Sequence, residues 1–188
     1  MRQAAVHQVG RHMSHSKIPS RVLAQLLLCS ALALPLLAQD SVPVRNRPLL
    51  AMIDSFLQHP GVGPSARAVT ESAAVRSDVM VNMSMNFLPF LCHQDSSPFV
   101  SAAHAMLMMG FVAGNMRAQL RLGRSGDQPA AGLRGELTVY RVLRAQGVTY
   151  RSPELDAWPD TSAAARLQAV ADSLASIKGD PCAHRAGG

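Results

Sequence analysis

Hydrophobic residues recur at helical spacing along most of the chain after residue 47. The last segment shows this best, because its apolar positions follow in steps of four, three, four and three: Ala163, Leu167, Val170, Leu174 and Ile177. Such steps place one apolar stripe along one face of an α-helix. With Gly179 as a helix-ending residue, the pattern predicts an amphipathic helix over residues 163–177.

Residues typical of helix starts and helix ends mark the limits of two earlier helices. Pro48 suits the first turn of a helix that ends at His59-Pro60-Gly61. Ser97-Pro98 supply an N-cap and a first-turn proline, and Gly123 supplies a terminating glycine. The segment between them has about 25 residues and would span roughly 37 Å as an α-helix.

The segment from Ser65 to Phe87 fits two patterns. Several apolar positions lie at roughly helical spacing, but residues 81–87 also alternate between apolar and polar side chains, as a strand does. We favour a helix that ends at Pro89, because no second strand with turn chemistry lies nearby to pair with this one.

Two further segments complete the predicted architecture. Residues 129–147 form a helix with one apolar side, and Pro153–Trp158 form a single helical turn. Five helices with short connections predict an all-α bundle. We divide the chain into a signal peptide (1–38), a flexible lead-in (39–47), a helical domain (48–182) and a disordered tail (183–188).

The signal peptide is predicted from the order of charge and hydropathy. Arg2, Arg11, Lys17 and Arg21 precede the apolar run Val22–Ala38, and no acidic residue occurs in these 38 positions. A basic segment, an apolar run and a small residue form a secretory signal. Cleavage after Ala33 and cleavage after Ala38 are both compatible with the sequence. An uncleaved anchor is the alternative, although Pro35 interrupts the run.

The net charge of +6 belongs to the whole chain, and removal of the signal peptide would lower it. Four of the 18 basic residues belong to the signal peptide, which leaves 14 basic and 12 acidic residues, a net charge of +2. The basic residues are scattered and aromatic residues are few, so the sequence lacks the basic patch of a nucleic-acid-binding protein. We expect a periplasmic or secreted location.

Cys92 and Cys182 are the two cysteines beyond the signal peptide. An even pair in an exported chain predicts a disulfide. Two free, buried thiols are the alternative. A redox motif or a zinc finger would need more cysteines.

The stretch between Ser96 and Met116 has 21 residues without a formal charge, which is long enough to span a membrane. Its polar residues and few strong membrane formers argue against a stable span. Gly110, Gly114 and Ala118 lie four apart, with Ala103 two turns earlier. We therefore predict that this face allows close packing of another helix.

Methionines and histidines raise the alternative of a copper-binding protein, because thioethers suit Cu(I). Met80 with Met83, and Met106 with Met109, would each share a helix face. Methionine is also an adaptable filler of cores and binding surfaces. No tight metal cluster follows from the spacing, so we predict no metal site and no cofactor, and His104 as a hydrogen-bonded core residue.

Enzyme motifs are missing from the sequence, including G-x-S-x-G, H-E-x-x-H and the P-loop. Glu154, Asp156 and Asp160 could form an acid/base group, but they flank two prolines on a connector that we expect to be solvated. We therefore predict no catalytic residues.

A set of segments in residues 88–182, about half of the chain, resembles the Tai-like periplasmic immunity proteins that neutralise amidase effectors of type VI secretion. The matching pieces are Leu91-Cys92, Gly110–Gly114, Leu133–Leu143, Ala163–Ile177 and Pro181-Cys182. The chain departs from that family in lacking further cysteines around the glycine-containing helix and in its extra N-terminal helices. The resemblance implies an exported helical domain that binds an effector, but it marks no contact residue.

The interpretation that unites these observations is an exported, non-catalytic helical protein that binds another protein, as an inhibitor or immunity factor. A homo-oligomer is compatible with the sequence. The alternative is a Met/His-rich periplasmic copper-binding protein.

Overall fold

The computed structural model describes residues 42–92 and 97–183, so the predicted signal peptide and the end of the tail lie outside the described residues. The α-helices are α3 (Arg47–Gln58), α4 (Pro64–Val75), α5 (Pro98–Leu122), α6 (Pro129–Ala145), α7 (Pro153–Ala157) and α8 (Ala164–Ala175). The 3-10 turns are η2 (Val44–Asn46), η3 (Met85–Phe87) and η4 (Pro89–Cys92). Five of these helices have at least 12 residues, and the described part of the chain contains no strand, which confirms the all-α fold.

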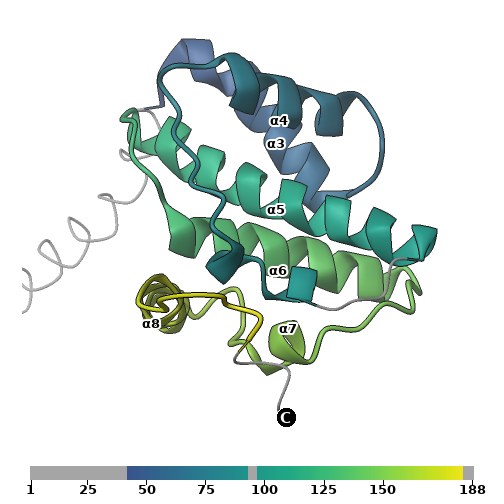
Figure 1. The fold of residues 1–188 in the computed structure, drawn as a ribbon. Helices are drawn as coiled ribbons and strands as arrows, with labels where there is room; N and C mark the ends of the chain where they lie inside the picture. Colours follow the sequence, from purple (N-terminus) through teal and green to yellow (C-terminus); the bar gives the residue numbers. More distant parts are fainter. Residues whose placement is uncertain (1–41, 93–96, 184–188) are drawn as a thin grey trace, which may run out of the picture. The chain divides into compact units, whose positions relative to one another are not determined.

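Helices α5 and α6 form the centre of the fold (Figure 1). They run side by side in opposite directions, joined by the short loop 123–128. Helices α3 and α4 pack on one side of this pair, and α8 packs on α6 and η3. The arrangement is a helical bundle with α5 as its central member.

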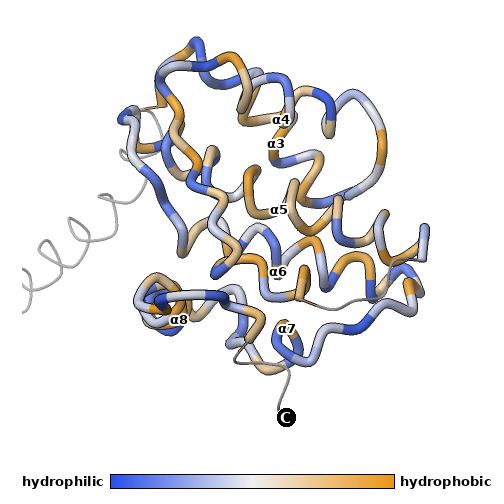
Figure 2. The backbone as a smooth tube through the Cα atoms, in the orientation of Figure 1, coloured by the Kyte–Doolittle hydropathy of each residue, from blue (hydrophilic) through white to orange (hydrophobic). Residues whose placement is uncertain are grey.

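Burial explains the apolar composition of α5. Hydrophobic positions run along most of this helix (Figure 2), and among the described residues only α5 is long and apolar enough to cross a membrane. However, 61% of its most apolar window is buried within the fold. A helix that is apolar on several sides is expected at the centre of a packed core.

The predicted ends of α5 are confirmed by their capping geometry. The Ser97 hydroxyl accepts a hydrogen bond from the Val100 backbone N–H at 3.3 Å. Gly123 ends the helix in the left-handed region, with φ of 64°. These two residues satisfy backbone groups that a bare helix terminus would leave without partners.

The predicted helix over residues 65–87 is wrong in its second half, because α4 ends at Val75. Residues 79–84 instead form an irregular segment without regular secondary structure, which passes in front of α5 (Figure 1). The Gln119 side chain holds this segment by accepting from the Met80 N–H at 2.9 Å and donating to the Met80 carbonyl at 2.5 Å. The Gln119 side-chain amide thus satisfies the backbone groups of Met80, which in a sheet would bond to a neighbouring strand.

The fold also begins earlier than predicted. Residues 44–46, which we assigned to the flexible lead-in, form the turn η2, and Asn46 is only 2% exposed. Its side chain donates to the Leu120 carbonyl at 3.3 Å and accepts from Arg76 at 2.9 Å. A buried amide with two partners fixes this segment against α5, and a hydrophobic pattern cannot reveal such a contact.

The predicted disulfide joins Cys92 to Cys182, whose Cα atoms are 5.2 Å apart. It ties the end of η4 to the residues after α8. The Asn86 side chain adds a hydrogen bond to the Ile177 carbonyl at 3.1 Å. Helix α8 itself ends at Ala175, two residues before the predicted end, and buries Leu167 and Ala171.

Candidate functional site

The predicted small-residue face of α5 packs against α6. A Cβ atom added at Gly114 would collide with the Ala131 carbonyl oxygen and would lie 2.9 Å from the Gly135 Cα. A Cβ at Gly110 would lie 3.1 Å from the Gly135 carbonyl oxygen. The two helices therefore touch through their backbones, because neither glycine has a side chain.

The other two residues predicted for this face have different surroundings. Ala103 is buried in the core, with an exposed fraction of 5%. Ala118 is half-buried and lines a groove beside the tight contact. The close approach is therefore concentrated at the two glycines.

The partner glycines on α6 were missed by the sequence analysis. Gly135 faces Gly114, and a Cβ added at Gly135 would collide with the Gly110 carbonyl oxygen. A Cβ at Gly132 would lie 2.6 Å from the Phe111 ring. The signal was present, because two glycines within three positions of a helix interior are costly unless packing requires them.

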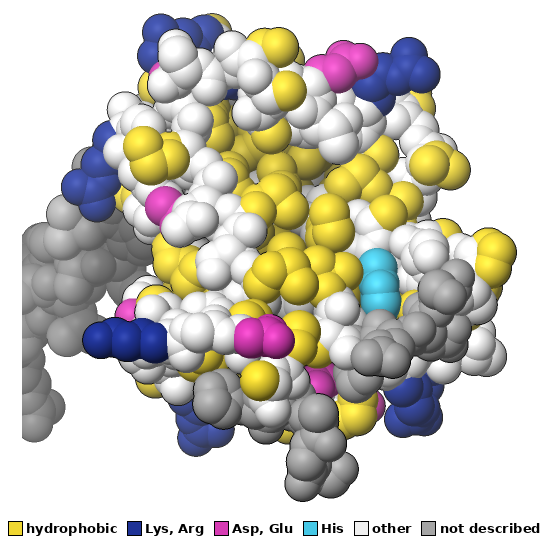
Figure 3. Space-filling model, in the orientation of Figure 1, with side chains coloured by type: hydrophobic (Ala, Val, Ile, Leu, Met, Phe, Trp, Pro, Cys, Tyr) yellow, Lys and Arg dark blue, Asp and Glu magenta, His cyan; other side chains and the backbone are white. Residues whose placement is uncertain are grey.

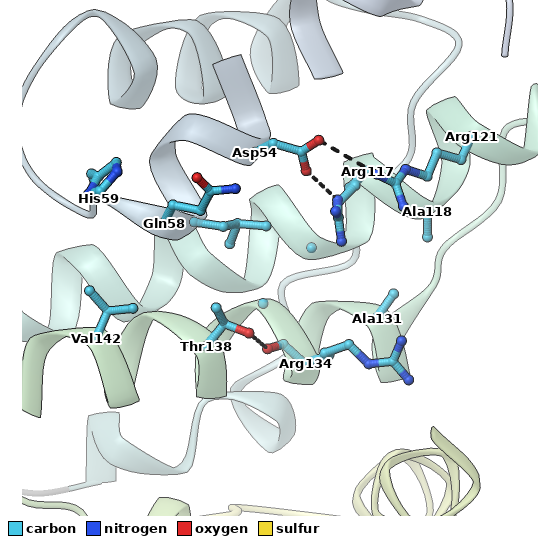
Figure 4. A pocket seen from close by; sticks show the side chains of 13 residues that line it. Asp54, Gln58, His59, Arg117, Ala118, Arg121, Ala131, Arg134, Thr138 and Val142 are labelled. Carbon is cyan, nitrogen blue, oxygen red and sulfur yellow. Dashed lines mark hydrogen bonds and ion pairs between the residues drawn. The ribbon is translucent and has the colours of Figure 1, made fainter. Parts of the chain in front are cut away.

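A groove of about 690 Å³ opens between α3, α5 and α6 (Figure 4). Its floor contains small residues from both central helices: Gly114, Ala118, Ala131 and Gly135. Leu57 and Val142 add apolar walls. We call this feature the arginine groove, because it is also lined by Arg117, Arg121 and Arg134.

Charges in the arginine groove are unevenly paired. Asp54 of α3 forms ion pairs with Arg117 at 2.5 Å and with Arg121 at 3.5 Å. Arg134 of α6 has no acidic partner among the described residues, and its buried Nε makes no hydrogen bond. Figure 4 shows the three arginines gathered toward one end of the groove. The site therefore keeps uncompensated positive charge.

The second candidate surface is the segment over residues 79–87, which we call the methionine segment. Met80 is 59% exposed, and Met83 and Met85 are each 43% exposed. Val79 and Val81 pack toward the core instead. Figure 3 shows hydrophobic side chains gathered across the middle of the face on which this segment lies.

Of the two methionine pairs that were predicted to share a helix face, only Met106 and Met109 lie on a helix. Met80 and Met83 have no common helix face, because their segment is not helical. Met106 and Met109 lie partly buried on α5 and pack against the core. Met116 is fully buried. In residues 42–92 and 97–183, no three His, Cys, Asp or Glu side chains are grouped as metal ligands would be.

No protein-family model matches this chain, and neither a curated protein nor a solved structure is significantly similar to it. The surfaces therefore have to be interpreted from their own chemistry.

A buried polar cluster lies between α5, α6 and the α6–α7 connection. The His104 Nε2 and the Tyr150 hydroxyl are 3.1 Å apart, which agrees with the predicted hydrogen bond, although His104 is half-buried and does not lie in the core. Glu136 is fully buried, and neither carboxyl oxygen has a hydrogen-bond partner within residues 42–92 and 97–183. Burial raises the pKa of Glu136 well above its ordinary value. It also raises the pKa of Tyr150, with nearby carboxylates adding to the effect.

Two of the three acidic residues of the connector belong to one hydrogen-bond network, and the third pairs elsewhere. Glu154 accepts from the Ser152 hydroxyl at 2.8 Å, and Asp156 accepts from the Tyr140 hydroxyl at 2.8 Å. Asp160 pairs with Arg141 at 2.8 Å. The Ser152 N–H donates to the Tyr140 hydroxyl at 3.3 Å, which links the contacts of Glu154 and Asp156.

Proposed function

We propose that this chain is an exported, non-catalytic helical protein that binds another protein, as an inhibitor or immunity factor. The observation that carries the proposal is the methionine segment. Large thioether side chains stand outward on a backbone that Gln119 fixes in place. Methionine is polarizable and adaptable, which suits a contact surface for another protein.

Fixing the segment in advance favours binding. A free loop loses conformational entropy when a partner orders it, and this loss weakens the complex. Here Gln119 bonds both backbone groups of Met80, and Asp127 accepts from the Asn82 N–H at 3.2 Å. The backbone is therefore ordered before the partner arrives, whereas the methionine side chains keep their freedom to adapt.

The disulfide supports the exported location. Disulfides persist in oxidising compartments such as the bacterial periplasm and the extracellular space. Export predicts that the mature chain begins at Leu34 or Gln39, depending on which cleavage position is used. Mass spectrometry of the N-terminus of the secreted chain tests this. An intact N-terminus would refute cleavage.

Partner capture tests the binding proposal. The tagged mature chain should retain one protein from the exported fraction in a stoichiometric complex. Met80→Asp with Met83→Asp should abolish retention, because a charge at each position cannot be desolvated in an apolar contact. Val62→Asp is the matched control, since Val62 is 93% exposed but lies outside the methionine segment. Equal retention by all variants would refute the surface.

The immunity role has its own test. A cell-wall amidase encoded beside this chain should bind it tightly, and co-expression in the periplasm should protect cells from that amidase. Cells that die despite a folded, exported chain would refute the immunity role while leaving other binding roles in place.

A further inference from the structure

The arginine groove has more basic than acidic side chains in its lining. One carboxylate, Asp54, is shared between Arg117 and Arg121. Arg134 stands on the opposite wall, on α6. Like charges around one groove repel one another, so this arrangement favours an anion between the two walls.

One donor atom of Arg134 lacks a hydrogen-bond acceptor among the described residues. This atom, the Nε, is buried and makes no hydrogen bond to any residue that the structure describes. A buried donor without an acceptor carries a free-energy penalty, which an incoming acceptor would remove if the side chain turned to expose Nε. The planar guanidinium offers paired donors that match a carboxylate. A carboxylate beside the Arg134 guanidinium would thus supply the missing negative charge.

The shape of the groove favours a peptide over a compact ion. Its volume of about 690 Å³ exceeds the space that one small ion fills, and the small residues of its floor have no long side chains that would fill it. Arg117, Arg121 and Arg134 occupy one end, whereas Val142 and His59 lie toward the other (Figure 4). A chain with acidic residues beside apolar ones matches this gradient.

We propose that the arginine groove binds an acidic segment of a protein, whose carboxylates pair with Arg121 and Arg134. The proposal rests on the proposed function, because it assigns the chemistry of the bound partner. The methionine segment would supply apolar contact area, and the arginine groove would select for acidic residues.

A labelled hexaglutamate peptide tests the groove directly. Fluorescence anisotropy with the mature chain should show saturable binding at about 50 mM NaCl that weakens at higher salt. Arg121→Gln with Arg134→Gln should weaken binding at least about tenfold. Arg151→Gln with Arg166→Gln removes the same charge from exposed sites outside the groove and should change binding less than about twofold. Circular dichroism confirms that each variant is folded.

Several outcomes would overturn the groove proposal. Absence of hexaglutamate binding to the wild-type chain would do so, as would equal weakening by both double variants. Displacement of the peptide by inorganic phosphate or citrate, beyond the effect of NaCl at matched ionic strength, would show a site for small anions. Binding of a hexaglutamine peptide with equal affinity would remove the role of charge.

The two proposals can fail separately. Capture of a partner that survives Arg121→Gln with Arg134→Gln but not Met80→Asp with Met83→Asp refutes the groove and supports protein binding. Hexaglutamate binding without capture of any exported protein refutes the proposed function, but it supports binding of acidic peptides in the arginine groove.

Discussion

Substituting Gly114 by alanine tests the backbone contact on which the bundle is built. The new Cβ would collide with the Ala131 carbonyl oxygen and would lie 2.9 and 3.0 Å from the Cα and N of Gly135. All three obstacles are backbone atoms, so no side-chain rotation relieves them. Helices α5 and α6 would have to move apart, with loss of packing along both.

The expected magnitude follows from two opposing effects. Overpacking a well-filled contact costs about 1–3 kcal/mol, and backbone obstacles place Gly114→Ala toward the upper end. Replacing glycine by alanine inside a helix returns up to about 1 kcal/mol. We therefore expect the free energy of unfolding to fall by about 1–2 kcal/mol, with a decrease in Tm of roughly 3–8 °C.

Urea unfolding followed by circular dichroism measures this loss. Gly110→Ala should cost less than Gly114→Ala, because the nearest obstacle at Gly110 is a methyl group of Val139 at 2.9 Å. Gly61→Ala is the control, since nothing lies within 4 Å of an added Cβ there. A Gly114→Ala variant as stable as the wild type would show that the helices do not touch at this point.

Three further predictions concern buried or constrained groups. Glu136→Leu should raise the free energy of unfolding at pH 7 by about 1–3 kcal/mol, because it removes an unpartnered buried acid. Because burial raises the pKa of Glu136 above its ordinary value of 4.5, the wild type should lose stability as the pH rises from about 4.5 through the folded-state pKa. Urea unfolding at pH 4 and pH 7 should show that this pH dependence is smaller in Glu136→Leu, and a variant less stable at pH 7 would contradict the reasoning. Cys92→Ser with Cys182→Ser should cost about 4–5 kcal/mol in the chain-entropy model for a separation of 90 residues, and a reducing agent should destabilise the wild type but not the variant. Gln119→Leu should speed hydrogen exchange of the Met80 amide, and unchanged exchange would mean that Gln119 does not hold the segment.

The helical segments with strong local signals were predicted with small errors. The α5 boundaries followed from Ser97-Pro98 and Gly123, because capping depends on residues adjacent in sequence. The segment over residues 79–87 was predicted as a helix because its strand-like alternation had no visible partner. Its partner is the side chain of Gln119, 39 residues away, and no local pattern contains that information.

The candidate sites depended even more on tertiary contacts. The glycines of α5 were recognised as a packing face from their spacing, but Gly135 became their partner only when α6 was placed against α5. Arg117, Arg121 and Arg134 look like scattered surface charges in the sequence. They form a groove because α5 and α6 approach closely enough for side chains from both helices to surround one floor.

The sequence by itself determined the helical class, most helix boundaries and the disulfide, because periodicity, capping and cysteine number act locally or allow few pairings. Only the tertiary structure decided which faces meet. It buried Glu136 without a partner and exposed the methionine segment. Both outcomes depend on the distances between segments far apart in the chain, and composition and periodicity do not specify those distances.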